Sequence, residues 1–377
     1  MSAVATNHSS VQSDPNSNYD MPPPACAGVS DDEPTDREEQ LALQVKEHPE
    51  LAGELISHLP TVDPNMSPTV GSYRIHGFSI PSDLPPYKLS DGSKAQERLS
   101  QIYQKDMQAG SDRRGHSMVV ACSSSLAVYQ ETEPLDERPI CPDEQIVFYV
   151  GGGGFSTCDT PVEKWLYVRM SKELGRRVFV SKYQVAPEGR FPQPIHDVYV
   201  AFKYLLTRGF EPQNILLFAA SAGGNIALAL LQILRMQQDS AVEKCVLIAP
   251  CVDLTLKSES WIRNQQRCVT KYRTIEDALS FTRMYYGPAD MDEVRKMAEH
   301  PLMSPIRGTL TGLPQMLVLV GSHDVLVDES RELARRIVDA GGDATYVEYP
   351  GKNHYTLLRG KTQLDKIYSQ IRHFVSQ

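Results

Sequence analysis

The sequence predicts an α/β fold built on a mostly parallel sheet with helices on both faces. From about residue 116, short apolar runs alternate with helical patterns, and this alternation is typical of a parallel sheet that is covered on both sides. The ligand site of such a sheet lies beyond the carboxyl ends of its strands. That rule directs attention to loops 151–158, 221–224, 321–328 and 350–356.

The expected elements follow from the apolar periodicity along the chain. Residues 41–110 are expected to form short helices, around 49–59 and 99–107. The later elements are expected to be strand 145–150, strand 177–183, helix 197–208, strand 214–220, helix 222–237, strand 244–249, strand 315–321, helix 328–340, strand 344–348 and helix 363–374. Residues 252–310 are a long insertion, and we expect it to form a cap with the N-terminal helices over the α/β domain, residues 111–377.

Acidity is concentrated at the N-terminus. Residues 1–40 contain eight acidic residues and one basic residue, so they hold −7 of the formal charge of −9 and leave −2 for residues 41–377. They contain no Leu, Ile, Phe or Trp, and such a segment cannot bury enough apolar surface to offset the entropy of ordering. We therefore expect a disordered acidic tail, with an acidic interaction arm as the alternative.

Composition also disfavours several functional classes. No tract is basic enough to follow a nucleic-acid backbone, and the N-terminus lacks the basic start and apolar stretch of a secretory signal. We therefore expect a cytoplasmic protein that binds no nucleic acid. The seven cysteines include no Cys-x-x-Cys pair, which disfavours a zinc site or a disulfide framework. Gly223 and Gly224 interrupt the apolar run 215–234, so this run predicts a strand, a turn and a helix rather than an integral membrane segment.

The turn within that run has the composition of a nucleophile elbow. Ser221 stands between a strand and a helix, with Ala219 two residues before it and Gly223 two residues after it. Small residues at these positions let the strand and the helix approach closely while the serine hydroxyl stays exposed at the tip. Taken alone, the pattern also fits Ser221 as an ordinary helix N-cap.

A run of glycines strengthens the interpretation of this turn as a nucleophile elbow. Strand 145–150 is followed by four glycines, residues 151–154, and then by Phe155. Because glycine has no Cβ, the N–H groups of such a loop can point into a site and bind an oxyanion, together with the amide that follows the serine. A phosphate loop would place Lys-Ser/Thr after the glycines, and a dinucleotide site would open a helix with Gly-x-Gly-x-x-Gly. The sequence fits neither pattern well.

An acid and a base complete the set in a specific order. Asp324 and His354 each follow a predicted strand, so both are expected at the sheet edge that carries Ser221. Asp328 is more simply interpreted as the N-cap of the next helix, and His323 as an ordinary exposed residue. The order Ser, Asp, His, each after a separate strand, matches the catalytic triad of an α/β-hydrolase.

Together, these motifs resemble the hormone-sensitive-lipase-like (GDXG lipolytic) branch of the α/β-hydrolases, whose motifs read His-Gly-Gly-Gly-aromatic and Gly-Asp-Ser-Ala-Gly-Gly. The further stretches that agree with this branch are 183–188, 191–192 with Asp197, 301–305, 313–314, 321–329 and 351–354. The resemblance covers residues 90–377. It implies an α/β-hydrolase fold and a serine carboxylic-ester hydrolase of the carboxylesterase or acetylesterase type, without a metal or an organic cofactor.

Carried over position by position, the resemblance implies Ser221 as the nucleophile, His354 as the general base and acid, and Asp324 as the residue that orients His354. The implied oxyanion hole consists of the backbone amides of Gly152, Gly153 and Ala222. The implied partner is a small-molecule ester with a short, acetyl-like acyl group on a lipophilic or natural-product alcohol.

Three motif positions depart from the family pattern. Gly151 replaces the family's His, Ala219 replaces the first Gly of the elbow, and Ala220 replaces the Asp before the nucleophile. The hole uses backbone donors and does not require the missing His, but the glycine loop loses a polar anchor. Two alternatives stay open: a non-hydrolytic protein of the same fold, such as a natural-product cyclase or a small-molecule binder, and a formamidase-type amide hydrolase. The sequence specifies no oligomeric state.

The insertion 252–310 carries large apolar side chains that have two interpretations. They either line a pocket for the acyl or alcohol group or pack a core of their own. These side chains are Trp261, Phe281, Met284, Tyr285 and Tyr286.

Overall fold

A computed structural model describes most of the chain. The described residues are 73–80, 94–109, 116–123, 140–141, 143–157, 161–239, 242–268, 275–354, 357 and 361–377. The expected acidic tail, residues 1–40, and the expected helix around 49–59 lie outside these residues.

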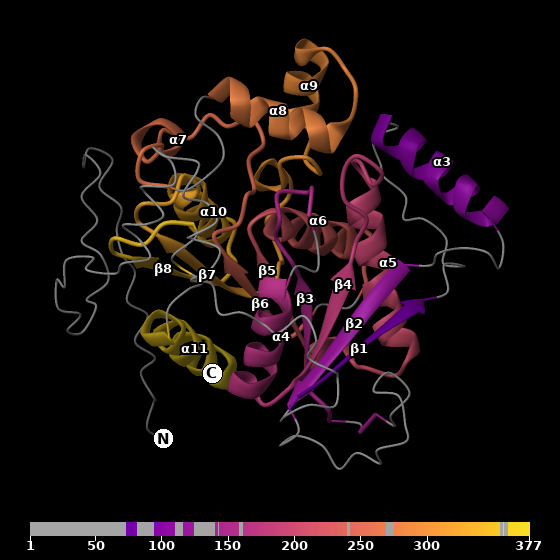
Figure 1. The fold of residues 1–377 in the computed structure, drawn as a ribbon, viewed down its shortest axis with the longest axis vertical. Coiled ribbons are helices and arrows are strands. Elements are labelled where there is room, and N and C mark those ends of the chain that lie inside the picture. Colours follow the sequence, from indigo (N-terminus) through magenta and orange to yellow (C-terminus); the bar gives the residue numbers. More distant parts are fainter. Residues whose placement is uncertain are drawn as a thin grey trace, which may run out of the picture. The chain divides into compact units, whose positions relative to one another are not determined.

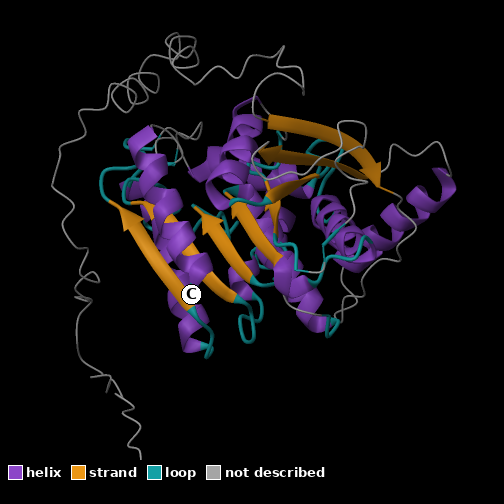
Figure 2. Ribbon diagram, turned by 90° about the horizontal axis from the view of Figure 1, so that it is seen from below, coloured by secondary structure: helices purple, strands orange, loops and turns teal. Residues whose placement is uncertain are grey.

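The described residues contain an eight-stranded sheet in the order β1-β2-β4-β3-β5-β6-β7-β8. The six strands from β4 to β8 in that order pair in parallel, whereas β1 and β2 are antiparallel. The strands are β1 (Tyr73–Ile80), β2 (His116–Ser123), β3 (Ile146–Val150), β4 (Arg177–Lys182), β5 (Ile215–Ala220), β6 (Lys244–Ile248), β7 (Gln315–Gly321) and β8 (Ala344–Tyr349). Figure 2 shows them fanning out as a twisted sheet. The predicted mostly parallel α/β fold is confirmed.

Helices cover both faces of the sheet. They are α3 (Lys94–Ala109), α4 (Pro161–Leu174), α5 (Gln193–Thr207), α6 (Ala222–Met236), α7 (Ser260–Arg263), α8 (Ile275–Tyr286), α9 (Met291–Ala298), α10 (Val327–Asp339) and α11 (Lys361–Ser376). On one face, α4 and α11 pack against the sheet and against each other (Figure 1). On the other face lie α5, α6 and α10. Burial from both sides explains why β3 and β5 are apolar along their whole length.

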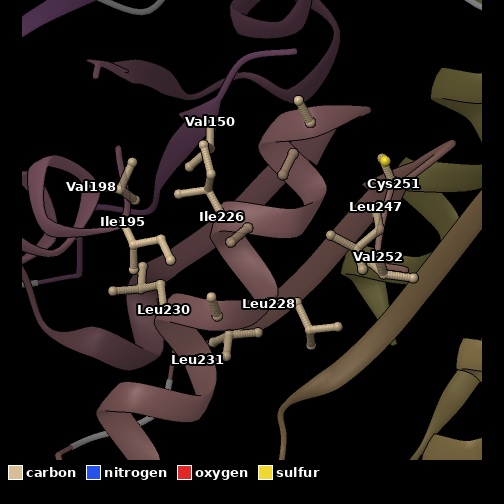
Figure 3. Close-up of a cluster of buried hydrophobic side chains, with 14 of the residues drawn as sticks. Val150, Ile195, Val198, Ile226, Leu228, Leu230, Leu231, Leu247, Cys251 and Val252 are labelled. Carbon is tan, nitrogen blue, oxygen red and sulfur yellow. The ribbon is translucent and has the colours of Figure 1, made fainter. Parts of the chain in front are cut away.

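Helix α6 lies at the centre of the second layer, and its residues from Ala222 to Leu234 are all buried. Figure 3 shows Ile226 and Leu230 of α6 in one cluster with Val150 of β3 and Ile195 of α5. The apolar run 215–234 is therefore a strand, a turn and a helix, as predicted. None of the helices in the described part of the chain combines the length and the apolarity that a membrane span needs.

Two expectations about local structure are wrong. Residues 41–110 contain strand β1 in addition to helix α3. This strand is an edge strand that pairs with β2 in an antiparallel register, and such pairing leaves a weaker pattern than burial on both faces does. Asp328 does not cap a helix: α10 begins one residue earlier, at Val327, and the Asp328 carboxylate accepts a 2.8 Å hydrogen bond from the N–H of Ser260.

The insertion 252–310 supplies helices α7, α8 and α9, and α3 packs against the last two (Figure 1). The Arg98 guanidinium lies 4.1 Å from the centre of the Tyr286 ring and donates a 2.6 Å hydrogen bond to the Tyr286 carbonyl. Lys94 pairs with Glu293 at 2.7 Å. These contacts join the two segments from which we expect a cap.

Candidate active site

Ser221 occupies a strained turn between β5 and α6. Its backbone has φ 53° and ψ −123°, in the left-handed half of conformational space that residues with a Cβ seldom adopt. Its N–H donates a 2.9 Å hydrogen bond to the carbonyl of Ile248. Its side chain makes no capping hydrogen bond to α6, so the interpretation of Ser221 as a simple N-cap is wrong. The turn has the geometry of a nucleophile elbow.

Close packing explains the small residues around Ser221. A Cβ added to Gly223 would lie 2.2 Å from the carbonyl oxygen of Val150 and 2.3 Å from that of Gly151. A side chain there would separate α6 from the end of β3, which carries the glycine loop. On the other side of the serine, Ala219 is fully buried in the core, and its methyl group is accommodated where the family has Gly.

The structure brings the three predicted side chains into one hydrogen-bonded chain. The Ser221 Oγ lies 2.9 Å from Nε2 of His354, and Nδ1 of His354 lies 2.8 Å from Oδ2 of Asp324. Asp324 follows β7 and His354 follows β8, so each of the three residues stands beyond the carboxyl end of a different strand. Such a chain can transfer the serine proton to the imidazole while the carboxylate orients the ring and stabilises its positive charge.

Burial and charge act in opposite directions on His354. Burial of the imidazole lowers the pKa of His354, but the charge and hydrogen bond of Asp324 together outweigh it and hold that pKa above the ordinary value. Asp324 itself is fully buried, and its other oxygen, Oδ1, accepts a 3.0 Å hydrogen bond from the N–H of Leu326. Both oxygens of this buried carboxylate therefore have hydrogen-bond partners.

The glycine loop passes next to the elbow. A Cβ added to Gly152 would lie 3.1 Å from the Cβ of Ser221. Gly153 has φ +107°, which favours glycine, and its carbonyl accepts hydrogen bonds from the N–H groups of Ser156 and Thr157. Ala222 is the first residue of α6, where N–H groups have no acceptor within the helix. Backbone amides in such positions can bind the oxyanion of a tetrahedral intermediate.

Tyr183 is a residue at this site to which the sequence assigned no role. Its buried hydroxyl donates towards the carbonyls of Gly151 and Gly152, at 2.8 and 3.1 Å. The loop that lacks the family's His thus has a polar anchor of a different kind. Tyr183 belongs to one of the stretches that agree with the family, and this was the only signal for it in the sequence.

Glu329 is a second residue to which the sequence assigned no role, and it lies close enough to Asp324 for the two charges to interact. Its carboxyl is almost fully buried and accepts a 3.0 Å hydrogen bond from the N–H of Val252. Burial, followed by the negative charge of Asp253, raises the pKa of Glu329 well above its ordinary value. Nowhere in the described ranges do three or more His, Cys, Asp or Glu side chains gather as they would around a metal ion.

The large side chains of the insertion are mainly core residues. Tyr285 and Tyr286 are fully buried, and the Tyr285 ring stacks on Phe155 with 3.8 Å between ring centres. Phe281 lies against the glycine loop, because a Cβ added to Gly154 would lie 3.0 Å from its ring. The structure therefore favours the core interpretation for the two tyrosines and places Phe281 beside the glycine loop.

Comparisons with known proteins agree with this geometry. The family described as alpha/beta hydrolase fold matches residues 147–358. An acetyl-hydrolase of Streptomyces hygroscopicus is 30% identical over 226 residues, which are 58% of this chain and 70% of the relative. An esterase of Acinetobacter venetianus is 30% identical over 207 residues, which are 55% and 66% of the two chains.

Solved structures show the same fold. An esterase from the bacterial hormone-sensitive lipase family superposes with a TM-score of 0.65 and 21% identity, over 90% of this chain and 96% of its own. A hormone-sensitive lipase from a metagenome library gives 0.59 and 24%, over 70% and 82%. The predicted resemblance is confirmed: the chain belongs to the α/β-hydrolase fold family and shares the fold of its hormone-sensitive-lipase-like members.

Proposed function

We propose that this protein is a serine carboxylic-ester hydrolase that removes a short acyl group from a small-molecule ester through an acyl-enzyme. The observation that carries the proposal is the hydrogen-bonded chain from Ser221 through His354 to Asp324. The class of reaction is supported by the curated relatives named acetyl-hydrolase and esterase. A cytoplasmic location stays a prediction.

Acylation begins when the Ser221 hydroxyl attacks the ester carbonyl. His354 takes the hydroxyl proton at Nε2, and the Asp324 carboxylate stabilises the imidazolium that forms. The carbonyl oxygen becomes an oxyanion, for which we propose the N–H groups of Gly152, Gly153 and Ala222 as donors. One such donor is worth a factor of roughly 10²–10³ in kcat. The alcohol leaves with the proton that His354 returns to it.

Deacylation repeats these steps with water as the nucleophile. His354 takes a proton from the water, the water attacks the acyl-serine carbonyl, and the acid product leaves as Ser221 regains its proton. The same backbone donors serve the second tetrahedral intermediate. The mechanism uses only side chains and amides of this chain and consumes one water for each ester cleaved.

A short acyl group is supported by the bulk beside the glycine loop. The Phe281 ring lies so close to Gly154 that even a methyl group there would be crowded, and the loop continues directly into the fully buried Phe155. We propose that the rings of Phe155 and Phe281 limit the space for the acyl group beside the glycine loop. We therefore expect acetyl and butyryl esters to be better substrates than octanoyl esters.

Two assays test the proposal. A fluorophosphonate probe is expected to label native protein and the Ser376→Ala control, in which an exposed serine of α11 is replaced, but not Ser221→Ala. Hydrolysis of p-nitrophenyl acetate is expected to fall by about 10⁶ in Ser221→Ala. Octanoate hydrolysed faster than acetate and butyrate would contradict the short-acyl proposal.

The same experiments separate the alternatives. A binder or cyclase of this fold would show no labelling of Ser221 and no ester turnover. A formamidase-type hydrolase would be labelled, but it would cleave an N-formyl arylamine faster than any of the three p-nitrophenyl esters. Either outcome would contradict the proposed esterase.

A further inference from the structure

The short segment after α7 touches the loop that carries the catalytic acid. We call residues 264–268 the clamp segment. The buried side-chain amide of Asn264 donates hydrogen bonds of 3.0 and 2.8 Å to the carbonyls of Ser322 and Asp324. At the other end of the segment, the fully buried Cys268 Sγ lies 4.0 Å from Oδ1 of Asp324. The clamp segment therefore contacts both the backbone and the carboxylate of the acid.

The clamp segment also contacts the loop that carries the base. Asn353, the residue before His354, is fully buried, and its side-chain amide donates a 3.0 Å hydrogen bond to the carbonyl of Arg267. The backbone carbonyl of Asn353 accepts a 3.0 Å hydrogen bond from the N–H of Leu357. One stretch of the insertion thus joins the loops of Asp324 and His354, which the chain brings from two different strands.

The clamp segment is itself attached to the domain by α7. The hydroxyl of Ser260 donates a 2.6 Å hydrogen bond to the carbonyl of Val325, and its N–H donates to Asp328 at 2.8 Å. Arg263 pairs with the same carboxylate at 2.6 Å. Asp328, which does not cap α10, thus has a structural role as the anchor of α7. These bonds fix where the clamp segment begins.

The sheet alone does not position the acid and the base. The ladder between β7 and β8 ends at the pair Gly321 and Tyr349, three residues before Asp324 and five before His354. Beyond that pair, the two loops bond each other through the N–H of His323 to the carbonyl of Lys352 and the N–H of Gly351 to the Ser322 hydroxyl, both at 2.9 Å. These bonds end before Asp324 and His354, and the clamp segment adds contacts at Asp324 and at Asn353. A misplacement of about 1 Å can cost a factor of 10² in rate, so contacts that hold such loops affect catalysis directly.

We propose that Asn264, Cys268 and Asn353 are positioning residues for the Asp324–His354 pair, so that the insertion takes part in the catalytic geometry. This inference rests on the proposed function, because it requires that Asp324 and His354 act in turnover. None of the three positioning residues transfers a proton. They act by fixing the distance and orientation of the carboxylate relative to the imidazole.

The test compares Asn264→Ala and Asn353→Ala with Gln232→Ala. Gln232 is a matched control because it is also a buried amide that bonds a carbonyl of the insertion, that of Pro305 at 2.6 Å, away from the acid and the base. Fluorophosphonate titration counts competent sites. Per competent site, kcat for p-nitrophenyl acetate is expected to fall by about 10- to 100-fold in both asparagine variants. We expect KM to stay within about 3-fold of the native value, because these variants lose positioning of the catalytic groups and not substrate binding.

The pH profile distinguishes positioning from a loss of folded protein. A looser Asp324 raises the pKa of His354 less, so the acid limb of kcat/KM is expected to move to lower pH in the asparagine variants and to stay in place in Gln232→Ala. Burial raises the pKa of Glu329 and of Cys251, two acids near Asp324. Burial and the charge of Arg267 lower the pKa of the neighbouring His323. These groups are present in every variant, so the Gln232→Ala control carries their contribution to the profile.

Cys268 provides a second comparison, with substitutions that we expect to destabilise the fold less than those of the asparagines. The Cys268 thiol lies 4.0 Å from Oδ1 of Asp324, and serine keeps a hydrogen-bond donor at this position, whereas alanine removes it. Cys268→Ser is expected to keep the native acid limb, and Cys268→Ala to shift it to lower pH. If the asparagine variants do not fold, this pair decides: identical profiles for Cys268→Ser and Cys268→Ala would overturn the inference.

Different experimental results would contradict this inference and the proposed function. Full activity in Ser221→Ala would overturn the proposed function and this inference with it. Loss of activity in Ser221→Ala, together with native kcat per site and a native acid limb in the Asn264 and Asn353 variants, would overturn this inference alone.

Discussion

The carboxylate of Asp324 is completely buried, and its Oδ2 lies 2.8 Å from Nδ1 of His354. A buried carboxylate is tolerated when hydrogen bonds and a partner charge compensate for its lost hydration. Here the N–H of Leu326 and the imidazole supply those bonds. The pair therefore sets the pH range in which the imidazole can accept the serine proton.

Replacing this carboxylate by an amide tests the electrostatic part of the arrangement. Burial lowers the pKa of His354 and Asp324 raises it by more, so Asp324→Asn is expected to move the acid limb of kcat/KM to lower pH. We expect kcat to fall by about 10⁴, because the amide favours the wrong tautomer of the imidazole. Rates on p-nitrophenyl acetate across pH measure both effects. Asp343→Asn, a change at an exposed carboxylate, is the control, and an unshifted limb in Asp324→Asn would contradict the prediction.

Tyr183→Phe tests the anchor of the glycine loop. Without the hydroxyl, the carbonyls of Gly151 and Gly152 lose a donor, and we expect about 1 kcal/mol of stability to be lost. The loop also becomes less well placed for an oxyanion, so kcat is expected to fall by about 10-fold while KM changes little.

A second tyrosine provides the control for that change. Tyr199→Phe removes a hydroxyl that bonds the side-chain amide oxygen of Gln237 at 3.1 Å, away from the glycine loop. It is expected to alter stability without altering kcat. Equal kcat in the two variants would show that Tyr183 does not support the loop in catalysis.

Glu329→Gln tests the raised pKa of this buried acid. The pKa of Glu329 is raised in the folded state, so the folded chain keeps this proton to higher pH than the unfolded chain does. The wild-type protein should therefore lose stability as pH rises above the ordinary carboxyl pKa, by about 1.4 kcal/mol for each pH unit over which only the unfolded chain is ionised. Glutamine does not titrate and can still accept from Val252. Thermal unfolding is measured for both proteins at about pH 5 and about pH 8. The stability of the variant relative to the wild type should be greater at the higher pH. A constant difference would mean that Glu329 is ionised in the folded protein.

Deleting residues 1–40 tests whether the acidic N-terminal segment contributes to catalysis. That segment holds −7 of the total charge and leaves −2 for the rest of the chain, which suits an uncharged ester. We expect kcat/KM for p-nitrophenyl acetate to stay within about 2-fold at low and high salt, since charges outside the site act mainly by screened long-range forces. A large decrease would assign the segment a role in turnover.

The local pattern of apolar residues was enough to predict the buried strands and the loops that follow them. Strands β3, β5, β6 and β7 are apolar along most of their length because helices cover both of their faces, and such runs stand out in a sequence. Strand β1 was missed because its antiparallel pairing at the sheet edge leaves a weaker pattern. Asp328 was misread as a cap because its partner, Ser260, is distant in the sequence.

The sequence by itself determined which residues stand at the ends of the parallel strands, and therefore which loops hold Ser221, Asp324, His354 and the glycines. Only the tertiary structure decided which other side chains support them. The bonds of Tyr183 to the glycine loop and of Asn264 to the Asp324 loop join segments that are remote along the chain. Tyrosine and asparagine are common residues with many uses, so their partners depend on which loops meet in space and leave no periodic or motif signal behind.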